Sequence, residues 1–155
     1  DILLSSYSGK LIRFHESKVR PMGRPARGVK GITLKDGMKV ISLIKGDPTK
    51  TILCLSENGF GKRTKLEDFP SYNRGGQGVI ALKTSDRNGN MVSAIAVNEN
   101  DGIMLISDKG TLIRTAISQI PTLGRNTQGV KVISPKDEEK LIEGVRIPPE
   151  EEEGE

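Results

Sequence analysis

The chain has little of what most enzymes and secreted proteins are built with. It holds one cysteine, Cys54, one histidine, His15, and no tryptophan, and aromatic residues make up only 3% of its 155 residues. A single cysteine excludes an internal disulfide framework and a zinc site made of thiolates. The scarcity of aromatic rings argues against a surface that binds single-stranded nucleic acid by stacking.

Long apolar runs are also missing. No stretch of about 18 apolar residues is present, so the sequence predicts no membrane-spanning helix and no membrane partner. Residues 1–8 lack the basic start and apolar continuation of a secretory signal. The hydrophobic content of 34%, with 18 glycines in addition, is that of a folded globular protein.

The sequence offers no grouping that is typical of catalysis. His15 has no partners for a triad or a metal site, and Cys54 falls inside an apolar stretch, which indicates a buried, inert thiol. The segment 59–64 superficially resembles a phosphate-binding loop, but Ser56 and Arg63 stand where that motif needs glycine and Ser or Thr. We therefore expect no catalytic residue, no metal and no cofactor in this chain.

Charge is distributed unevenly along the chain. All 24 Lys and Arg lie at or before Arg146, whereas five of the 20 Asp and Glu lie in the last six residues, which leaves a net charge of +9 on residues 1–147. A basic body of this size favours a polyanionic partner, of which nucleic acid is the commonest. The acidic tail, 148–155, has one sign of charge and no apolar residue, so we expect it to be disordered.

The same pattern recurs three times. An apolar stretch that ends in serine is followed by a glycine, an arginine, a second arginine and a Gly-Val pair, at spacings of 50 and 51 residues. The recurring positions are Gly9, Gly59 and Gly110; Arg13, Arg63 and Arg114; Arg24, Arg74 and Arg125; and Gly28, Gly78 and Gly129. Three units result, at about 1–50, 51–102 and 103–147, followed by the tail.

Each unit is predicted to form short strands joined by turns. In the first unit we expect four strands, near 2–6, 10–14, 28–34 and 39–44, with glycine turns between them. No window shows sustained helical periodicity. Strand units repeated at a period near 50 residues predict an all-β, propeller-like array of three four-stranded blades.

Basic residues occupy equivalent places in the three units. If the units are arrayed around an axis, these residues form a positive band along a curved rim that suits bent duplex DNA, because arginine can bind phosphates through two donors at once. Nothing in the pattern reads base edges, so we expect little sequence specificity. The candidate contact residues are Lys10, Arg13, Lys18, Arg20, Arg24, Arg27 and Lys30 in the first unit, Lys62, Arg63, Lys65, Arg74, Gly75 and Gly76 in the second, and Arg114, Arg125 and Lys131 in the third.

A structural interpretation of the same residues stays open. Arginine also caps loop carbonyls, and glycine makes turns. For Gly9, Gly59 and Gly110 we favour the structural role, and for the extra charges of the first unit we favour contact with DNA. For Arg24, Arg74 and Arg125 both interpretations remain.

Four stretches carry a resemblance to a known family. RPARGVKGI (residues 24–32), ENGFGKRT (57–64), RGGQGVI (74–80) and GRNTQGV (124–130) closely resemble the C-terminal domain of DNA gyrase A subunits. The resemblance covers about residues 1–147 and extends to the acidic tail. It implies a six-bladed β-pinwheel, a propeller-like fold whose blades exchange a strand, of which three repeats would be the C-terminal half.

The resemblance also implies a function. The domain wraps duplex DNA around its edge and supports ATP-dependent negative supercoiling by a heterotetramer with the rest of gyrase A and the gyrase B subunits, in the cytoplasm on the bacterial chromosome. The family's signature box, Gln-Arg-Arg-Gly-Gly-Lys-Gly, has here only the degenerate copy Tyr72-Asn73-Arg74-Gly75-Gly76-Gln77-Gly78. Two alternatives remain: the equivalent domain of topoisomerase IV, and a propeller scaffold that binds acidic proteins.

Overall fold

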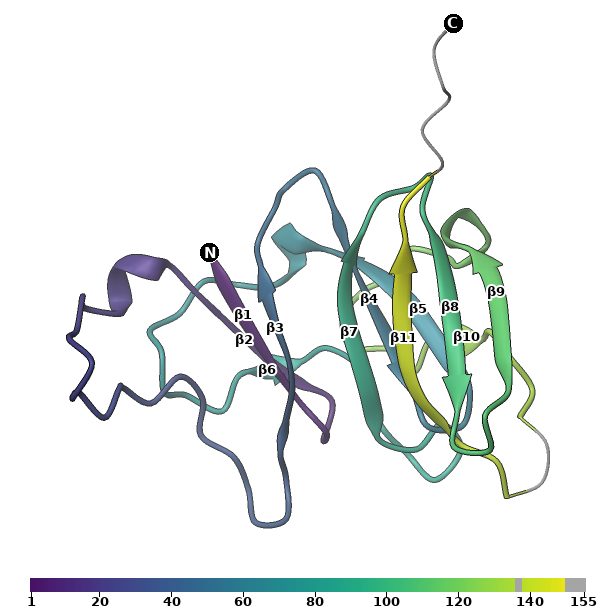
Figure 1. Ribbon diagram of the computed structural model, residues 1–155, viewed down its shortest axis with the longest axis horizontal. Helices are drawn as coiled ribbons and strands as arrows, with labels where there is room; N and C mark the ends of the chain where they lie inside the picture. The colour runs from purple at the N-terminus through teal and green to yellow at the C-terminus, as the bar shows by residue number, and fades with distance from the viewer. Residues whose placement is uncertain (136–137, 150–155) are drawn as a thin grey trace, which may run out of the picture.

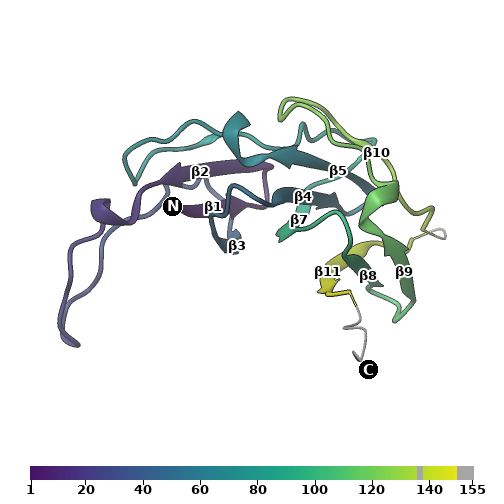
Figure 2. The same cartoon turned by 90° about the horizontal axis from the view of Figure 1, so that it is seen from above.

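The computed structural model describes residues 1–135 and 138–149, so the expectation for the tail beyond residue 149 lies outside the described residues. The described part consists of β-strands, loops and three short 3-10 helices. The strands form three antiparallel sheets that stand as neighbouring blades along an arc (Figures 1 and 2). The predicted all-β, propeller-like class is confirmed.

Each blade is one sheet. The first runs β3 (Val40–Lys45), β1 (Ile2–Ser6), β2 (Lys10–Phe14), β6 (Val79–Ile80). The second runs β7 (Met91–Val97), β4 (Thr51–Ser56), β5 (Phe60–Lys65), β10 (Val130–Lys131). The third runs β11 (Leu141–Ile147), β8 (Gly102–Ser107), β9 (Leu112–Ala116). One 3-10 helix follows the second strand of each unit. These helices are η1 (Glu16–Lys18), η2 (Leu66–Asp68) and η3 (Ile117–Gln119).

The hairpin at the start of each unit turns on a glycine. Gly59 has φ +85°, and a Cβ atom there would lie 2.3 Å from the carbonyl oxygen of Ile133. The turn therefore needs glycine both for its backbone conformation and for the close approach of a later segment. The structural role favoured for this glycine is confirmed.

The outer strand of a blade comes from the following unit. β6, in the second unit, pairs with β2 of the first blade, and β10, in the third unit, pairs with β5 of the second blade. Our expectation of a strand at 28–34 is wrong: the equivalent segments β6 and β10 pair with the blade before their own, and no described strand lies beside residues 28–34. The third sheet has three strands among the described residues, not four, and β9 has an exposed outer edge.

Two apolar clusters lie between the blades. One fills the space between the first and second blades around Leu3 and Ile52, and the other lies between the second and third around Leu55 and Leu105. Phe69 belongs to the first cluster and follows η2 directly, so it fixes the start of the long loop that leads to β6. Burial of these apolar surfaces stabilises the arc and holds the outer loops in place.

The arc has an inner and an outer side. The inner strands β3, β7 and β11 lie toward its concave side, and the long loops that lead to β6 and β10 run along its convex side (Figure 2). The loop of the first unit extends beyond β1 and β2 at the end of the arc (Figure 1). No helix in the described ranges is long and apolar enough to cross a membrane.

Candidate nucleic-acid interface

The convex side and the first-unit loop carry most of the predicted contact residues in exposed positions. Nine of them have exposed side chains or backbone: Lys18, Arg20, Arg24, Arg27, Lys30, Lys65, Gly76, Arg114 and Lys131. Five are half-buried, namely Lys10, Arg13, Arg74, Gly75 and Arg125, and two are buried, Lys62 and Arg63. The sixteen residues therefore do not form one uniform surface.

The first-unit loop, residues 18–30, is the most basic exposed segment. Arg24 and Arg27 are exposed, and within the described parts of the chain no hydrogen bond or ion pair engages either side chain. Both guanidinium groups are therefore available to an outside anion. This is the arrangement expected of a phosphate contact.

Arg74 holds this loop against the second unit. Its Nε donates to the carbonyl of Lys18 at 3.0 Å, and its Nη1 donates to the carbonyl of Lys30 at 3.1 Å. The backbones also meet, since the N–H of Gly75 donates to the carbonyl of Gly31 at 2.6 Å. Of the two interpretations left open for Arg74, the structure supports the structural one: it fixes both ends of the basic loop.

Arg13 and Arg63 brace the loops of the following units. Arg13 Nη1 donates to the carbonyls of Leu66 at 3.1 Å and Phe69 at 2.9 Å, around η2. Arg63 Nε donates to the carbonyl of Ile120 at 2.7 Å, just after η3, and the side chain is nearly fully buried. Arg13 is half-buried by the loop that it holds, so both arginines are structural.

Arg114 occupies the same place in the third unit and has a different environment. Its side chain is exposed, and within the described residues no loop carbonyl accepts its N–H groups. The role of the recurring arginine therefore depends on whether a loop of the following unit packs over it, and not on its position in the repeat.

Lys62 is the largest departure from the predicted interface. It is fully buried on β5, and its Nζ donates to the carbonyls of Gly124 at 2.8 Å and Arg125 at 2.6 Å and to Thr127 Oγ1 at 2.9 Å. An ammonium enclosed in this way does not reach a phosphate outside the fold. Lys62 and Arg63, both predicted as DNA contacts, are buried in this structure and are not exposed to an outside phosphate.

Three further candidates lie on β5, on β10 and on the loop that precedes β10. Arg125 is half-buried, and its Nη1 donates to the carbonyl of Ile80 at 3.3 Å, a long bond that leaves other donors of the group free. Lys131 is exposed on β10, and Lys65 is exposed at the end of β5, 4.0 Å from Glu67. At that separation and exposure the ion pair holds Lys65 weakly.

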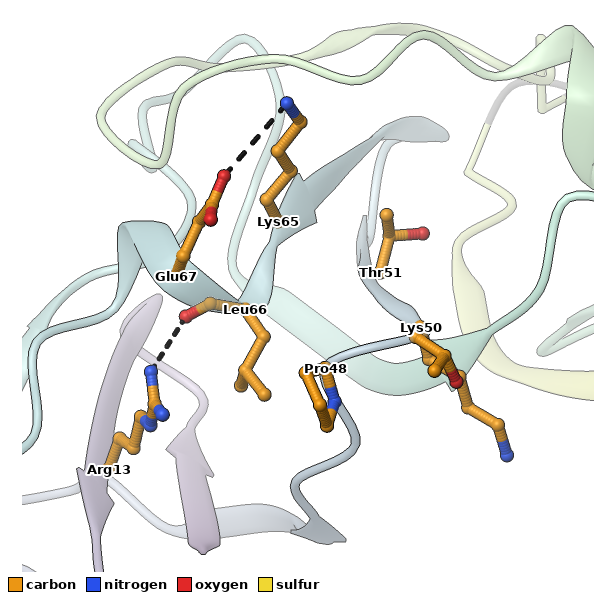
Figure 3. A pocket seen from close by; sticks show the side chains of 8 residues that line it. Arg13, Pro48, Lys50, Thr51, Lys65, Leu66 and Glu67 are labelled. Atoms are coloured by element: carbon orange, nitrogen blue, oxygen red, sulfur yellow. Dashed lines mark hydrogen bonds and ion pairs between the residues drawn. The ribbon is translucent and has the colours of Figure 1, made fainter.

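A hollow of about 390 Å³ lies where the first and second blades meet. Figure 3 shows Arg13 donating to the carbonyl of Leu66 on one side of it, and Lys65 reaching toward Glu67 on another. Pro48 and Thr51 complete its walls. Its lining contains no histidine, cysteine or carboxylate pair, and it lies at the junction of the first two blades.

The two residues considered for catalysis have structural environments. His15 Nδ1 accepts the N–H of Ser17 at 3.1 Å and caps η1 in an exposed position. Cys54 is fully buried, and burial raises the pKa of its thiol to about 12. The predicted burial of this thiol is confirmed. In the described residues, no three side chains among His, Cys, Asp and Glu lie together as a metal site would require.

Sequence reasoning missed the site that encloses Lys62. Gly124 and Thr127 contribute to it, and neither carries a charge that would draw attention. One signal was present: Lys62 stands where the other units have Ile12 and Ile113. A lysine at a position that is otherwise apolar indicates a buried cation with dedicated partners.

Comparison with known proteins shows the family of this chain. The family model for the DNA gyrase C-terminal domain, beta-propeller, matches residues 1–45, 50–98 and 103–147. The DNA gyrase A protein of Pseudomonas aeruginosa is 51% identical over 142 residues, and that of Escherichia coli is 45% identical; each alignment covers 92% of this chain. The chain spans about 15% of the length of these relatives.

Two solved structures have the same fold as this chain. The structure of a DNA gyrase A C-terminal domain superposes with a TM-score of 0.85 at 28% identity, over 95% of this chain and 50% of that one. The C-terminal domain of a DNA topoisomerase IV gives a TM-score of 0.86 at 24% identity, over 94% of this chain and 46% of that one, and shows the same fold.

Proposed function

Because the chain belongs to the DNA gyrase C-terminal domain family, we propose that it binds duplex DNA along the convex side of its arc, independently of base sequence, and helps to wrap it. The proposal is supported above all by the guanidinium groups of Arg24 and Arg27, which are unpaired within the described residues, on a loop whose two ends are held by Arg74. Lys18, Arg20 and Lys30 add three exposed charges to the same loop.

The structural arginines contribute to this function indirectly. Arg74 fixes the basic loop, and Arg13 and Arg63 fix the loops that follow η2 and η3. Hydrogen bonds from the fold therefore hold these loops at their ends. An ordered cationic surface loses less conformational entropy on binding than a mobile one, so rigid loops favour affinity for the regularly spaced phosphates of a duplex.

Within the parent protein, we propose that this segment presents DNA to a gyrase that supercoils it with ATP. The partners would be the rest of the gyrase A chain and the gyrase B chains, in the cytoplasm and on the bacterial chromosome. Catalysis would belong to those other parts, and this segment would act through binding alone, with no cofactor of its own.

The test is a titration of the chain with a short duplex at several salt concentrations. Binding should weaken steeply with salt, with a log–log slope of about −0.9 per phosphate contact. Two duplexes of unrelated sequence should give similar affinities. No binding even at low salt would overturn the proposal and favour a scaffold for acidic proteins.

Charge reversal identifies the surface. Arg24→Glu/Arg27→Glu should weaken binding by at least tenfold, since it replaces two attractive contacts with repulsive ones. The matched control is Lys35→Glu/Lys45→Glu, which changes net charge equally at exposed residues on β3 and the turn before it. Equal losses in the two variants would show that net charge, not this loop, governs binding.

A further inference from the structure

The enclosed ammonium of Lys62 has acceptors for its three protons but no counter-ion among them. Two acceptors are the backbone carbonyls of Gly124 and Arg125, and the third is the hydroxyl of Thr127. Thr127 in turn donates to the carbonyl of Gly124 at 2.9 Å. A buried charge with neutral partners is costly, because hydrogen bonds to neutral oxygens replace only part of its hydration.

This arrangement occurs in one blade of the three. In the first blade Ile12 stands at the position of Lys62, and Gly76 stands over it at the position of Thr127; a Cβ on Gly76 would lie 3.6 Å from Ile12 Cδ1. The isoleucine and glycine of the first blade thus correspond to the lysine and threonine of the second. The first blade shows that the fold accommodates an apolar pair at this place.

The surroundings favour loss of the proton. Burial, the dominant cause, lowers the pKa of Lys62 to about 8. The titratable or charged groups that act on it are Cys54 on β4 and Arg125 on the loop. A thiolate at Cys54 would raise the pKa of Lys62, but burial raises the pKa of this thiol to about 12 and keeps it uncharged at neutral pH, whereas the guanidinium of Arg125 repels the ammonium.

We propose that Lys62 is a positioning residue for the outer loop 121–128: its ammonium holds the backbone that carries Arg125, and a phosphate bound at this loop in turn keeps Lys62 protonated. The inference rests on the proposed binding of DNA. The phosphate provides the negative charge that the buried site lacks, so the two events stabilise each other. Without its proton, Lys62 donates two hydrogen bonds instead of three, and one loop oxygen loses its donor.

The linkage is measured on the whole chain by two methods. At constant ionic strength, duplex affinity should fall about two- to fivefold between about pH 7 and about pH 9, as expected if DNA binding raises the pKa of Lys62 by half a unit to one unit. The NMR signals of the Lys62 side chain should titrate near pH 8 without DNA, and at higher pH with it.

Two variants separate positioning from simple charge. Lys62→Met removes the proton and keeps the approximate volume, and Lys62→Ile/Thr127→Gly copies the arrangement of the first blade. Both should bind more weakly at about pH 7 and show a flat pH profile. Arg24→Glu/Arg27→Glu serves as control, because it should bind weakly while Lys62 still titrates near pH 8.

The outcomes distinguish this inference from the proposed function. If the chain binds duplex with a flat pH profile, or if the titration of Lys62 does not move when DNA binds, the linkage is overturned while DNA binding stands. If no duplex binds at low salt at any pH, the proposed function fails first. Should either variant not fold, the NMR titration of the unaltered chain still decides.

Discussion

The recurring arginine offers the sharpest test of how this fold is held together. Arg13, Arg63 and Arg114 are equivalent in sequence but lie in three environments: half-buried, buried and exposed. Replacing each with methionine removes the donors and keeps much of the apolar stem. The three variants therefore measure the hydrogen bonds that each guanidinium makes, with little change in packing.

The magnitudes follow from the contacts. Arg63→Met leaves the carbonyl of Ile120 without its donor, which costs about 1.5–3 kcal/mol for a charged donor, while the pair with the exposed Glu99 adds less than about 1 kcal/mol. Arg13→Met strips two carbonyls and an ion pair with Asp1, so a loss of about 2–3 kcal/mol is expected. Arg114→Met should change stability by less than about 0.5 kcal/mol.

Equilibrium unfolding in urea, followed by circular dichroism, measures these differences. For a chain of this size, 2 kcal/mol corresponds to a fall in melting temperature of about 4–8 °C. The reasoning is refuted if Arg114→Met costs as much as Arg63→Met, because the role of the arginine would then not depend on the unit that covers it. DNA binding by folded Arg114→Met is a separate readout of its exposed position.

Further measurements test other features of the fold. Gly59→Ala should destabilise the chain by at least about 1 kcal/mol more than Gly110→Ala: both glycines have positive φ, but a Cβ at Gly59 meets a backbone oxygen at 2.3 Å and one at Gly110 meets nothing within 4 Å. The carboxyl of Asp101 is buried, which would raise its pKa, but hydrogen bonds from Arg146 and a backbone N–H outweigh burial and lower it. Its stabilisation is therefore present at neutral pH and lost as the pH falls through the lowered pKa, so Asp101→Asn should flatten the acid limb of an unfolding-versus-pH curve. Cys54 should resist a thiol reagent at about pH 8 until the chain is unfolded, because burial raises its pKa and blocks access.

Local sequence patterns predicted the hairpins correctly. They did not predict strand pairing between segments that lie far apart in the sequence. The strands at 2–6 and 10–14 agree with β1 and β2, because apolar stretches around a glycine turn are local signals. The segment 28–34 has the same kind of composition and forms no strand, because a strand needs a neighbour to pair with.

The same limit applied to the candidate site. The local sequence around Arg63 does not reveal that its guanidinium meets the carbonyl of Ile120, 57 residues later. Arg24 and Arg27 were assigned to the interface on charge density, and the structure leaves them exposed and unpaired within the described residues. Charge patterns predicted which segments are basic, but burial decided which of their side chains face outward.

Because the outer strand of a blade comes from the following repeat, one sequence repeat of about 50 residues does not correspond to one blade. A stretch of about 50 residues accepts a strand on one side and supplies one on the other, as the second unit does between its neighbours. Inserting a whole extra copy of such a stretch recreates the same two boundaries and introduces no new kind of contact. Tandem duplication can therefore lengthen the array one blade at a time. Each added repeat supplies the outer strand of the blade before it and is joined to that blade by this pairing.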